Sequence, residues 1–246
     1  MISNRDLEAY IVELLAVARF NDYAPNGLQI EGKQQISRIA TAVSASLEVI
    51  QQAQAFNADA LLVHHGYFWK GEPAVICGLK KNRIAALFEK DINLYAYHLP
   101  LDDFPLWGNN ASIAKRLDLT VAGKVDLVWC GALTNPMTYA QLLTNLRDIY
   151  GQQVQGIMAH QSPIKNIAWC SGAAYDYFEK IIAQDVDAFI TGEFSERTYH
   201  LAKESKINFF AAGHHATEKD GINCLGEHLA DKFNLQHLFI DEDNPF

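Results

Sequence analysis

The stretch DALLVHHG, residues 59–66, is a short apolar run that ends in two adjacent histidines and a glycine. A run of this length that stops at a turn residue is typical of a strand buried on both faces of a sheet. Imidazole is seldom buried unless something holds it. His64 and His65 are therefore either polar residues of a turn or two metal ligands presented at the edge of a sheet.

Strands and helices alternate along the rest of the chain, which predicts an α/β fold. The expected architecture is two α/β subdomains with mixed, largely parallel sheets flanked by helices. The stretch LPLDDFPLWGNN at 99–110 is expected to be a long polar turn. Strands are predicted at 38–45, 59–66, 92–98, 125–133, 154–160, 164–172, 187–193, 207–213 and 235–241, and helices at 3–18, 46–56, 80–90, 110–117, 138–151, 173–184, 195–205 and 216–233.

The composition indicates a globular protein and argues against an extended nucleic-acid partner. Of the 246 residues, 49% are hydrophobic and 20% charged, which is typical of a folded domain. A net charge of -9 argues against extended nucleic acid, whose binding depends on clustered Lys and Arg. The first residues lack the pattern of a signal peptide, no run is long enough to span a bilayer, and the four cysteines lie far apart. These features predict a cytoplasmic protein with reduced thiols.

Polar side chains gather where the predicted strands end. In open α/β sheets, ligands bind outside the carboxyl ends of strands, so these side chains are expected to converge on one site. A His-His pair or an HxxxE spacing is a weak signal by itself, but their joint occurrence at strand ends favours a metal site. The residues concerned are His64, His65, His98, Asp102, His214 and Glu218.

The chemistry of this set suits two divalent transition-metal ions. Imidazole with carboxylate is compatible with Zn, Fe or Mn, and the residues do not choose among them. Two such ions lower the pKa of a bound water and hold the attacking and leaving oxygens. If a helix begins at His214, Glu218 lies one turn further along the same face.

Five motifs together resemble a known family. They are NGLQIEG at 26–32, LLVHHGYFWKGE at 61–72, HLPLD at 98–102, TGE at 191–193 and GHHATE at 213–218. Their order and spread are similar to the NIF-three-like family, also called GTP cyclohydrolase I type 2 homologues, in its short bacterial YbgI-like branch. Many relatives have Pro where this chain has Gly66, and Thr-Asn where it has Leu99 and Pro100.

The resemblance implies a two-domain α/β subunit, a dinuclear metal centre and a homo-oligomer in the form of a hexameric ring. It places the metal ligands at His64, His65, Asp102, His214 and Glu218. The function it implies is a metal-dependent hydrolase acting on a nucleotide-like small molecule, with purine-ring opening of GTP as one candidate reaction. The alternative is a non-catalytic metal-binding protein or regulatory scaffold.

Two further residues are expected to act as catalytic groups that move protons. His98 lies at a strand end beside Asp102, where it either holds the Asp102 carboxylate or is a half-buried structural histidine. Glu193 follows the strand that ends in TGE. The turn at Ser171 and Gly172 is expected to serve mainly as turn and capping structure.

Two questions stay open at this point. The segment from Tyr67 through Phe68 and Trp69 to Lys70 is either part of the substrate site or packing against a core or a neighbouring subunit. The division into domains follows from the requirement that His214 and Glu218 reach His64, so the last segment returns to the first domain. The expected limits are 1–124 plus 207–246 for the metal-binding domain and 125–206 for the second.

Overall fold

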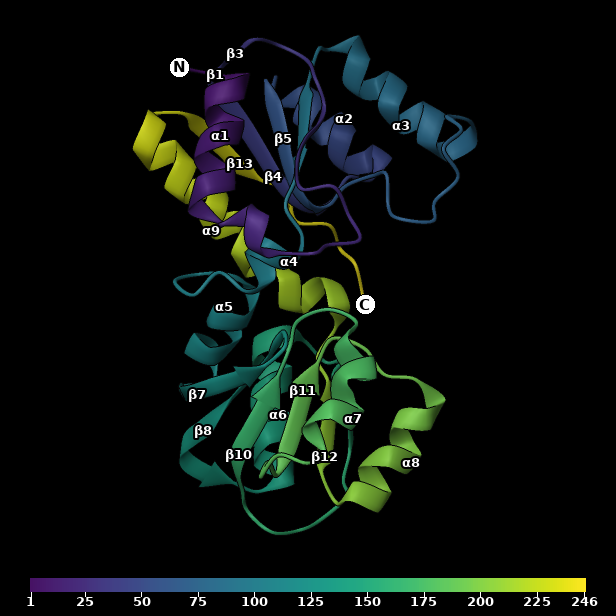
Figure 1. The fold of residues 1–246 in the computed structure, drawn as a ribbon, viewed down its shortest axis with the longest axis vertical. Coiled ribbons are helices and arrows are strands. Elements are labelled where there is room, and N and C mark those ends of the chain that lie inside the picture. Colours follow the sequence, from purple (N-terminus) through teal and green to yellow (C-terminus); the bar gives the residue numbers. More distant parts are fainter. The chain divides into compact units, whose positions relative to one another are not determined.

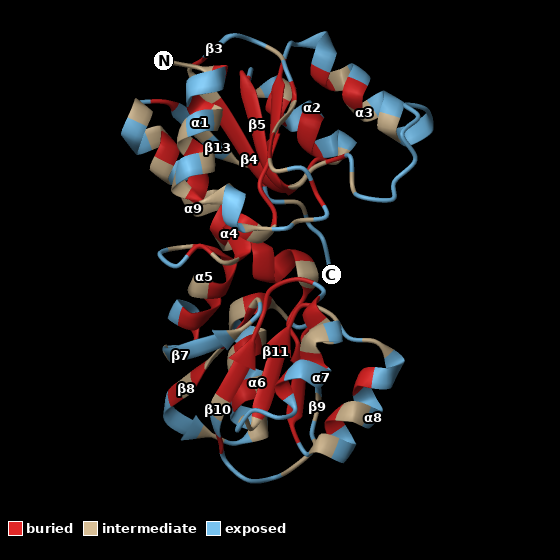
Figure 2. Cartoon of the chain, viewed as in Figure 1, coloured by how far each residue is buried: buried red, intermediate tan, exposed pale blue.

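The structure, a computed structural model, describes residues 1–246 and divides into two compact units. The first unit contains residues 1–104 and 219–243, and the second contains residues 105–218 and 244–246. Figure 1 traces both, and Figure 2 shows that the central strands of each unit are mostly buried while helices expose their outer faces. No helix combines the length and the apolar character needed to cross a membrane.

The first unit is built on a five-stranded sheet in the order β13-β4-β5-β6-β2. All neighbours pair in parallel except β2, which runs antiparallel to β6 at one edge. A two-stranded antiparallel pair, β1 with β3, lies outside this sheet. The strands are β1 (Ile2–Ser3), β2 (Gly27–Ile30), β3 (Gln35–Ile36), β4 (Arg38–Ser44), β5 (Ala60–His65), β6 (Asn93–Ala96) and β13 (Gln236–Phe239).

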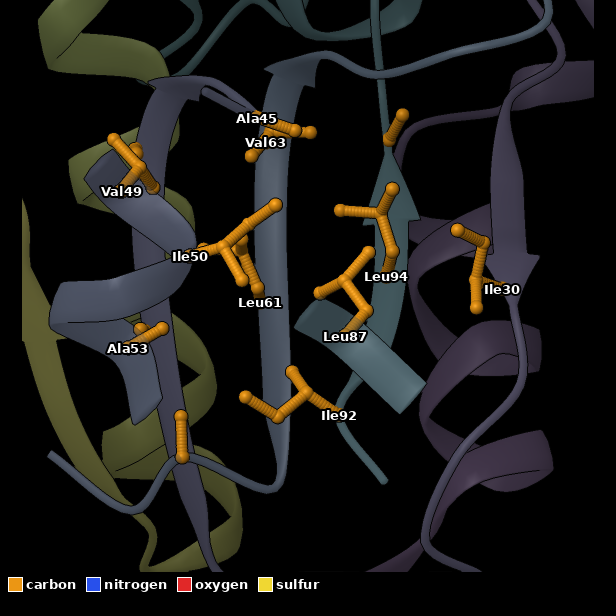
Figure 3. Packing of buried hydrophobic residues seen from close by; sticks show 14 of the residues in the cluster. Ile30, Ala45, Val49, Ile50, Ala53, Leu61, Val63, Leu87, Ile92 and Leu94 are labelled. Atoms are coloured by element: carbon orange, nitrogen blue, oxygen red, sulfur yellow. The ribbon is translucent and has the colours of Figure 1, made fainter. Parts of the chain in front are cut away.

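Helices cover this sheet with apolar side chains. Figure 3 shows Ile50 and Leu87 packed against the strand residues Leu61 and Leu94. Gly226 permits close packing of a helix on the sheet, because a Cβ there would lie 2.7 Å from a methyl carbon of Thr41. The helices are α1 (Asn4–Leu14), η1 (Val17–Arg19), α2 (Leu47–Ala55), α3 (Gly78–Glu89), α4 (Leu99–Asp102) and α9 (His214–Phe233), of which α9 belongs to this unit from Lys219 onward.

The second unit is built on a six-stranded sheet in the order β7-β8-β10-β11-β12-β9. Only β10, β11 and β12 are parallel to one another, and the outer pairs are antiparallel. The strands are β7 (Leu119–Val125), β8 (Val128–Met137), β9 (Gln155–Ile157), β10 (Ile164–Trp169), β11 (Ala188–Thr191) and β12 (Asn208–Ala211).

Alternation along the central strands gives this sheet two apolar faces. Phe209 belongs to a cluster with Phe178, and Phe210 belongs to a separate cluster with Leu142 and Leu146. The two faces are therefore covered by different helices. These are α5 (Asn109–Arg116), α6 (Tyr139–Tyr150), η2 (Ala174–Tyr177), α7 (Phe178–Ile181), α8 (Glu196–Ser205) and the first turn of α9.

The expected α/β class with mixed sheets is confirmed, and three local predictions need correction. The expected turn at 99–110 begins with a short helix, α4, which tolerates Pro100 because proline suits the first turn. Strands β1, β2, β3 and β7 were not predicted, and five of the seven residues of β7 are exposed. The helix predicted at 173–184 is a 3-10 turn followed by the four-residue α7.

The limits of the two units differ from the predicted domain limits. Residues 105–124 and 207–218 lie in the second unit. The reason for the later segment is that β12 pairs with β11 on one side and β9 on the other. The C-terminal strand β13 does return to the first unit, where it pairs with β4.

Candidate metal centre

In the first unit, three histidines meet at the carboxyl end of the sheet. His64 and His65 end β5, and their ring centroids lie 4.6 Å apart. His98 follows β6, with its ring centroid 5.0 Å from that of His64. One nitrogen from each of the three rings lies within 4.8 Å of the other two, which is close enough to hold a metal ion.

The Nδ1 atoms of the paired histidines face protein groups. His64 Nδ1 lies 3.0 Å from the carbonyl oxygen of Tyr97, and His65 Nδ1 lies 3.1 Å from the hydroxyl of Ser44. A carbonyl can only accept a hydrogen bond, so His64 carries a proton on Nδ1, and Nε2 is the ring nitrogen that could bind a metal. Protein groups that fix the second ring nitrogen in this way are typical of metal-ligating histidines.

His98 is held by Asp22, which was not predicted. The Asp22 carboxylate accepts from His98 Nδ1 at 2.9 Å, from Asn26 at 2.9 Å and from the Leu99 backbone N–H at 3.0 Å. Burial acts to raise the pKa of Asp22, but the hydrogen bonds and charge of His98 and the bond from Asn26 outweigh it and lower the pKa to about 2. Asp22 therefore stays ionised and fixes the orientation of the imidazole.

Asp102 lies beside His64. Its Oδ1 is 3.5 Å from His64 Nε2, and its side chain is buried. Helix α4 explains the placement, because the Asp102 N–H donates to the His98 carbonyl at 3.2 Å and closes one helical turn. The HLPLD motif thus delivers an imidazole and a carboxylate from the two ends of a single turn.

Gly66 lies where neighbouring groups leave no room for a side chain. A Cβ at this position would overlap Gln29 Oε1 and lie 2.6 Å from Ala96 Cβ. Gln29 Oε1 also accepts from the Tyr67 N–H at 2.7 Å. Glycine is required here because neighbouring groups pack closely against the end of β5.

The three aromatic residues after Gly66 have different surroundings. Tyr67 is buried and donates its hydroxyl to the Ala45 carbonyl at 2.7 Å. Phe68 lies under Lys80, whose Nζ is 4.7 Å from the ring centroid. Trp69 lies near the histidines, with its ring centroid 5.1 Å from that of His98 and 6.0 Å from that of His65.

In the second unit, α9 begins at His214, two residues before the predicted helix, and therefore places Glu218 one turn later. His214 Nε2 lies 3.2 Å from Glu218 Oε2, and Nδ1 lies 2.5 Å from Glu193 Oε1. Burial acts to lower the pKa of His214, but hydrogen bonds and charge from Glu218 and Glu193 outweigh it and raise the pKa to about 9. A cation, either a proton or a metal ion, is therefore favoured between these carboxylates.

The turn after β10 makes room for this pair. Gly172 has φ +63°, and a Cβ there would overlap Glu218 Oε1. Its N–H donates at 3.1 Å to Thr217, which itself donates to the Gly213 carbonyl at 2.9 Å. The turn at Ser171 and Gly172 thus does more than the predicted capping, because it packs against the Glu218 carboxylate.

The donor chemistry in both units fits a transition metal. Each unit contributes imidazole with carboxylate, a combination that suits Zn, Fe and Mn. The groups that could hold a metal are formed from His, Asp and Glu side chains. The cysteines contribute to none of these groups.

Known proteins similar to this chain agree with the motifs. The family model Duf34/NIF3 (NGG1p interacting factor 3) matches residues 2–245. A GTP cyclohydrolase 1 type 2 homolog of Yersinia pestis is 48% identical over 98% of this chain and 99% of its own length. The corresponding homolog of Escherichia coli K12 is 45% identical over 99% of this chain and all of its own.

Solved structures are similar over the same span. The protein ybgI, described as of unknown function, has a TM-score of 0.97 and 44% identity, with 100% of both chains covered. TTHA1606 of Thermus thermophilus has a TM-score of 0.92 and 32% identity, again with 100% of both chains covered. The resemblance expected from the five motifs is confirmed: this chain belongs to the DUF34/NIF3 family.

Proposed function

We propose that the chain is a metal-dependent hydrolase with two divalent transition-metal ions per subunit, Zn, Fe or Mn, acting on a nucleotide-like small molecule. The observation that carries the proposal is the state of the ring nitrogens. His64, His65 and His214 each have Nδ1 against a protein group, the arrangement typical of histidines that bind a metal through Nε2. The proposed ligands are His64, His65, Asp102, His214 and Glu218.

Four of the five proposed ligands form two imidazole–carboxylate pairs. In the first unit, His64 Nε2 lies 3.5 Å from Asp102 Oδ1. In the second unit, His214 Nε2 lies 3.2 Å from Glu218 Oε2. Asp102 and Glu218 would each offer a carboxylate to the ions. When bound, a pair of such ions supplies Lewis acidity and a water of lowered pKa.

His98 and Glu193 are proposed to hold and move protons in the reaction. Asp22 accepts from His98 Nδ1, so His98 Nε2 is the ring atom that would exchange a proton with substrate or solvent. Glu193 has one oxygen on His214 Nδ1 and a side chain that is 43% exposed. It therefore orients His214 and also remains accessible from solvent.

The substrate class rests on the names of relatives. Several are called GTP cyclohydrolase 1 type 2 homolog, which supports a nucleotide-like substrate and keeps purine-ring opening of GTP as one candidate reaction. The family resemblance also supports a cytoplasmic homohexamer in the form of a ring. Light scattering of the purified protein would test the ring, and a monomer or dimer would contradict it.

The test combines metal content with turnover. Protein grown with Zn, Fe and Mn should contain about two transition ions per chain, and it should hydrolyse at least one member of a panel of nucleotides, phosphoesters and cyclic amides. His64→Ala and Glu218→Ala should lose both metal and turnover, while His200→Ala, which changes an exposed histidine of α8, should lose neither.

The outcomes separate the alternatives. About two ions per chain without turnover on any member of the panel would favour the non-catalytic metal-binding or scaffold function. A folded protein with one ion or none would contradict the dinuclear centre.

A further inference from the structure

A pocket of about 510 Å³ opens in the second unit beside Glu193. It lies past the carboxyl ends of β11 and β12, which is where open α/β sheets bind ligands. Its volume falls in the usual range for small-molecule sites. The residues that line it are Gln153, Gln155, Gly192, Glu193, Phe194, Ala211, Gly213, Pro245 and Phe246.

Aromatic and amide groups dominate the walls. Phe194 is 42% exposed and Phe246 is 75% exposed, so both rings have faces available for stacking. Gln153 already donates its Nε2 to the Tyr150 carbonyl at 2.5 Å, which leaves its Oε1 as an acceptor. The exposed Gln155 side chain offers both a donor and an acceptor.

The charge of the walls excludes phosphate as the preferred ligand. Glu193 is the one ionisable side chain among the lining residues, and neither Lys nor Arg is among them. Arg147 lies near this loop, but its Nε donates to the Val154 carbonyl at 3.2 Å and the residue does not line the pocket. A phosphate here would meet a carboxylate without a compensating cation.

A neighbouring pocket extends the same surface. Its volume is about 390 Å³, and it shares Gln155 and Phe194 with the first. Its further lining residues include Tyr199 and the acidic Glu196. The shared wall therefore continues the aromatic and amide character of the first pocket.

The walls of the first pocket are held in place by backbone contacts. The Phe246 carbonyl oxygen accepts from the His215 N–H at 2.8 Å, at the start of α9. The Gly213 N–H donates to the Gly192 carbonyl at 3.0 Å. Because these contacts already order the walls, binding of a ligand does not carry the additional entropy cost of ordering them.

We propose that this pocket binds the planar, uncharged heterocyclic ring of the substrate and does not hold phosphate groups. The ring stacks on Phe194 and Phe246, and Gln153 and Gln155 recognise its polar edge. The inference deepens the proposed function and rests on it in one respect: Glu193, which lines the pocket, also contacts the proposed ligand His214.

Binding without turnover tests this directly. Isothermal titration of the metal-loaded full chain would compare two probes, guanosine as an uncharged ring and ribose 5-phosphate as a phosphate without a ring. Phe194→Ala should weaken guanosine about ten-fold, as expected for loss of one stacking partner, and Gln155→Ala about three-fold. Gln152→Ala, an exposed neighbour outside the pocket, should change it less than about two-fold.

Three results would overturn the proposal. The first is that guanosine shows no saturable binding. The second is that Phe194→Ala leaves the guanosine affinity unchanged. The third is that Phe194→Ala weakens the affinity for ribose 5-phosphate as much as the affinity for guanosine. Because the readout is affinity, these results leave metal content and turnover to be measured separately. A chain that binds guanosine as expected but contains no metal would contradict the proposed hydrolase and leave the ring pocket standing.

Discussion

Two helices, α8 and α9, each carry a histidine and a glutamate four residues apart, and the two pairs are similar in spacing and distance but differ in burial. In α8, Glu196 Oε1 lies 3.0 Å from His200 Nε2, and the side chains are 87% and 61% exposed. In α9, Glu218 Oε2 lies 3.2 Å from His214 Nε2, and the side chains are 3% and 28% exposed. Spacing and distance therefore do not identify a metal-binding pair. The pair proposed to bind a metal differs in its burial and in the contact at the other ring nitrogen, because His214 Nδ1 is held by Glu193.

The largest effect is expected when the contact at His214 Nδ1 is removed. Glu193→Gln keeps the shape of the side chain but removes the charge that orients His214. Metal affinity should fall about 10- to 100-fold, as expected when a partner of a ligating histidine is lost. The measurement is competition with a chromophoric chelator, with Glu196→Gln as the matched control that should leave metal affinity unchanged. Equal effects in both variants would show that the buried and exposed pairs do not differ in this respect.

The comparison also explains which parts of the candidate site were predictable. His64 and His65 end an apolar run, and His214 with Glu218 begins a helix, so each set is visible in a few adjacent residues. Asp102 lies four residues after His98 and follows the same local logic. Local spacing is readable because strand ends and helix turns place neighbouring residues in fixed directions.

The partners of these histidines depend on tertiary structure and were not predictable in the same way. Asp22 meets His98 across 76 residues of chain, and it lies in a loop without a motif of its own. Glu193 was selected from its place after a strand, but its contact with His214 was not predicted. The close packing at Gly172 also needs the helix start and the β10 turn to be placed together.

The fold shows the same limit. The buried strands β4, β5, β10, β11 and β12 are apolar runs and were predicted, whereas the exposed strand β7 was not. β7 forms because β8 offers a partner along its length, and its own sequence has five consecutive exposed residues. Tertiary pairing can therefore impose a strand where burial gives no periodic signal.

Asp59 is a carboxylate that is buried but is not among the proposed metal ligands. This buried carboxylate accepts from Lys33 Nζ at 2.7 Å, from the Ser37 N–H and hydroxyl at 2.9 Å each, and from the Arg38 N–H at 3.0 Å. Asp59→Asn should lower the free energy of unfolding by about 1 to 2 kcal/mol, because donors lose a charged acceptor. Urea denaturation would measure it, and an unchanged midpoint would contradict the prediction.

The pH dependence of Asp59 has a definite sign. Burial acts to raise its pKa, but the bonds from Lys33, Ser37 and Arg38 outweigh burial and lower the pKa below the ordinary value of 3.8. A group whose pKa is lower in the folded state stabilises the fold above its unfolded pKa and loses that contribution as the pH falls. The difference in stability between the parent chain and Asp59→Asn should therefore stay constant between pH 6 and about 5 and shrink as the pH is lowered below about 4.

The exposed pair should show the smallest effect. Glu196 and His200 hold each other in solvent, where Coulomb attraction is screened and two mobile side chains must be ordered. A double-mutant cycle with Glu196→Ala and His200→Ala should give a coupling free energy within about 0.5 kcal/mol of zero. Raising the salt concentration should reduce even that value. A coupling above about 1.5 kcal/mol would mean that four-residue spacing alone generates a strong pair, and the distinction between α8 and α9 would then rest on metal binding and not on burial.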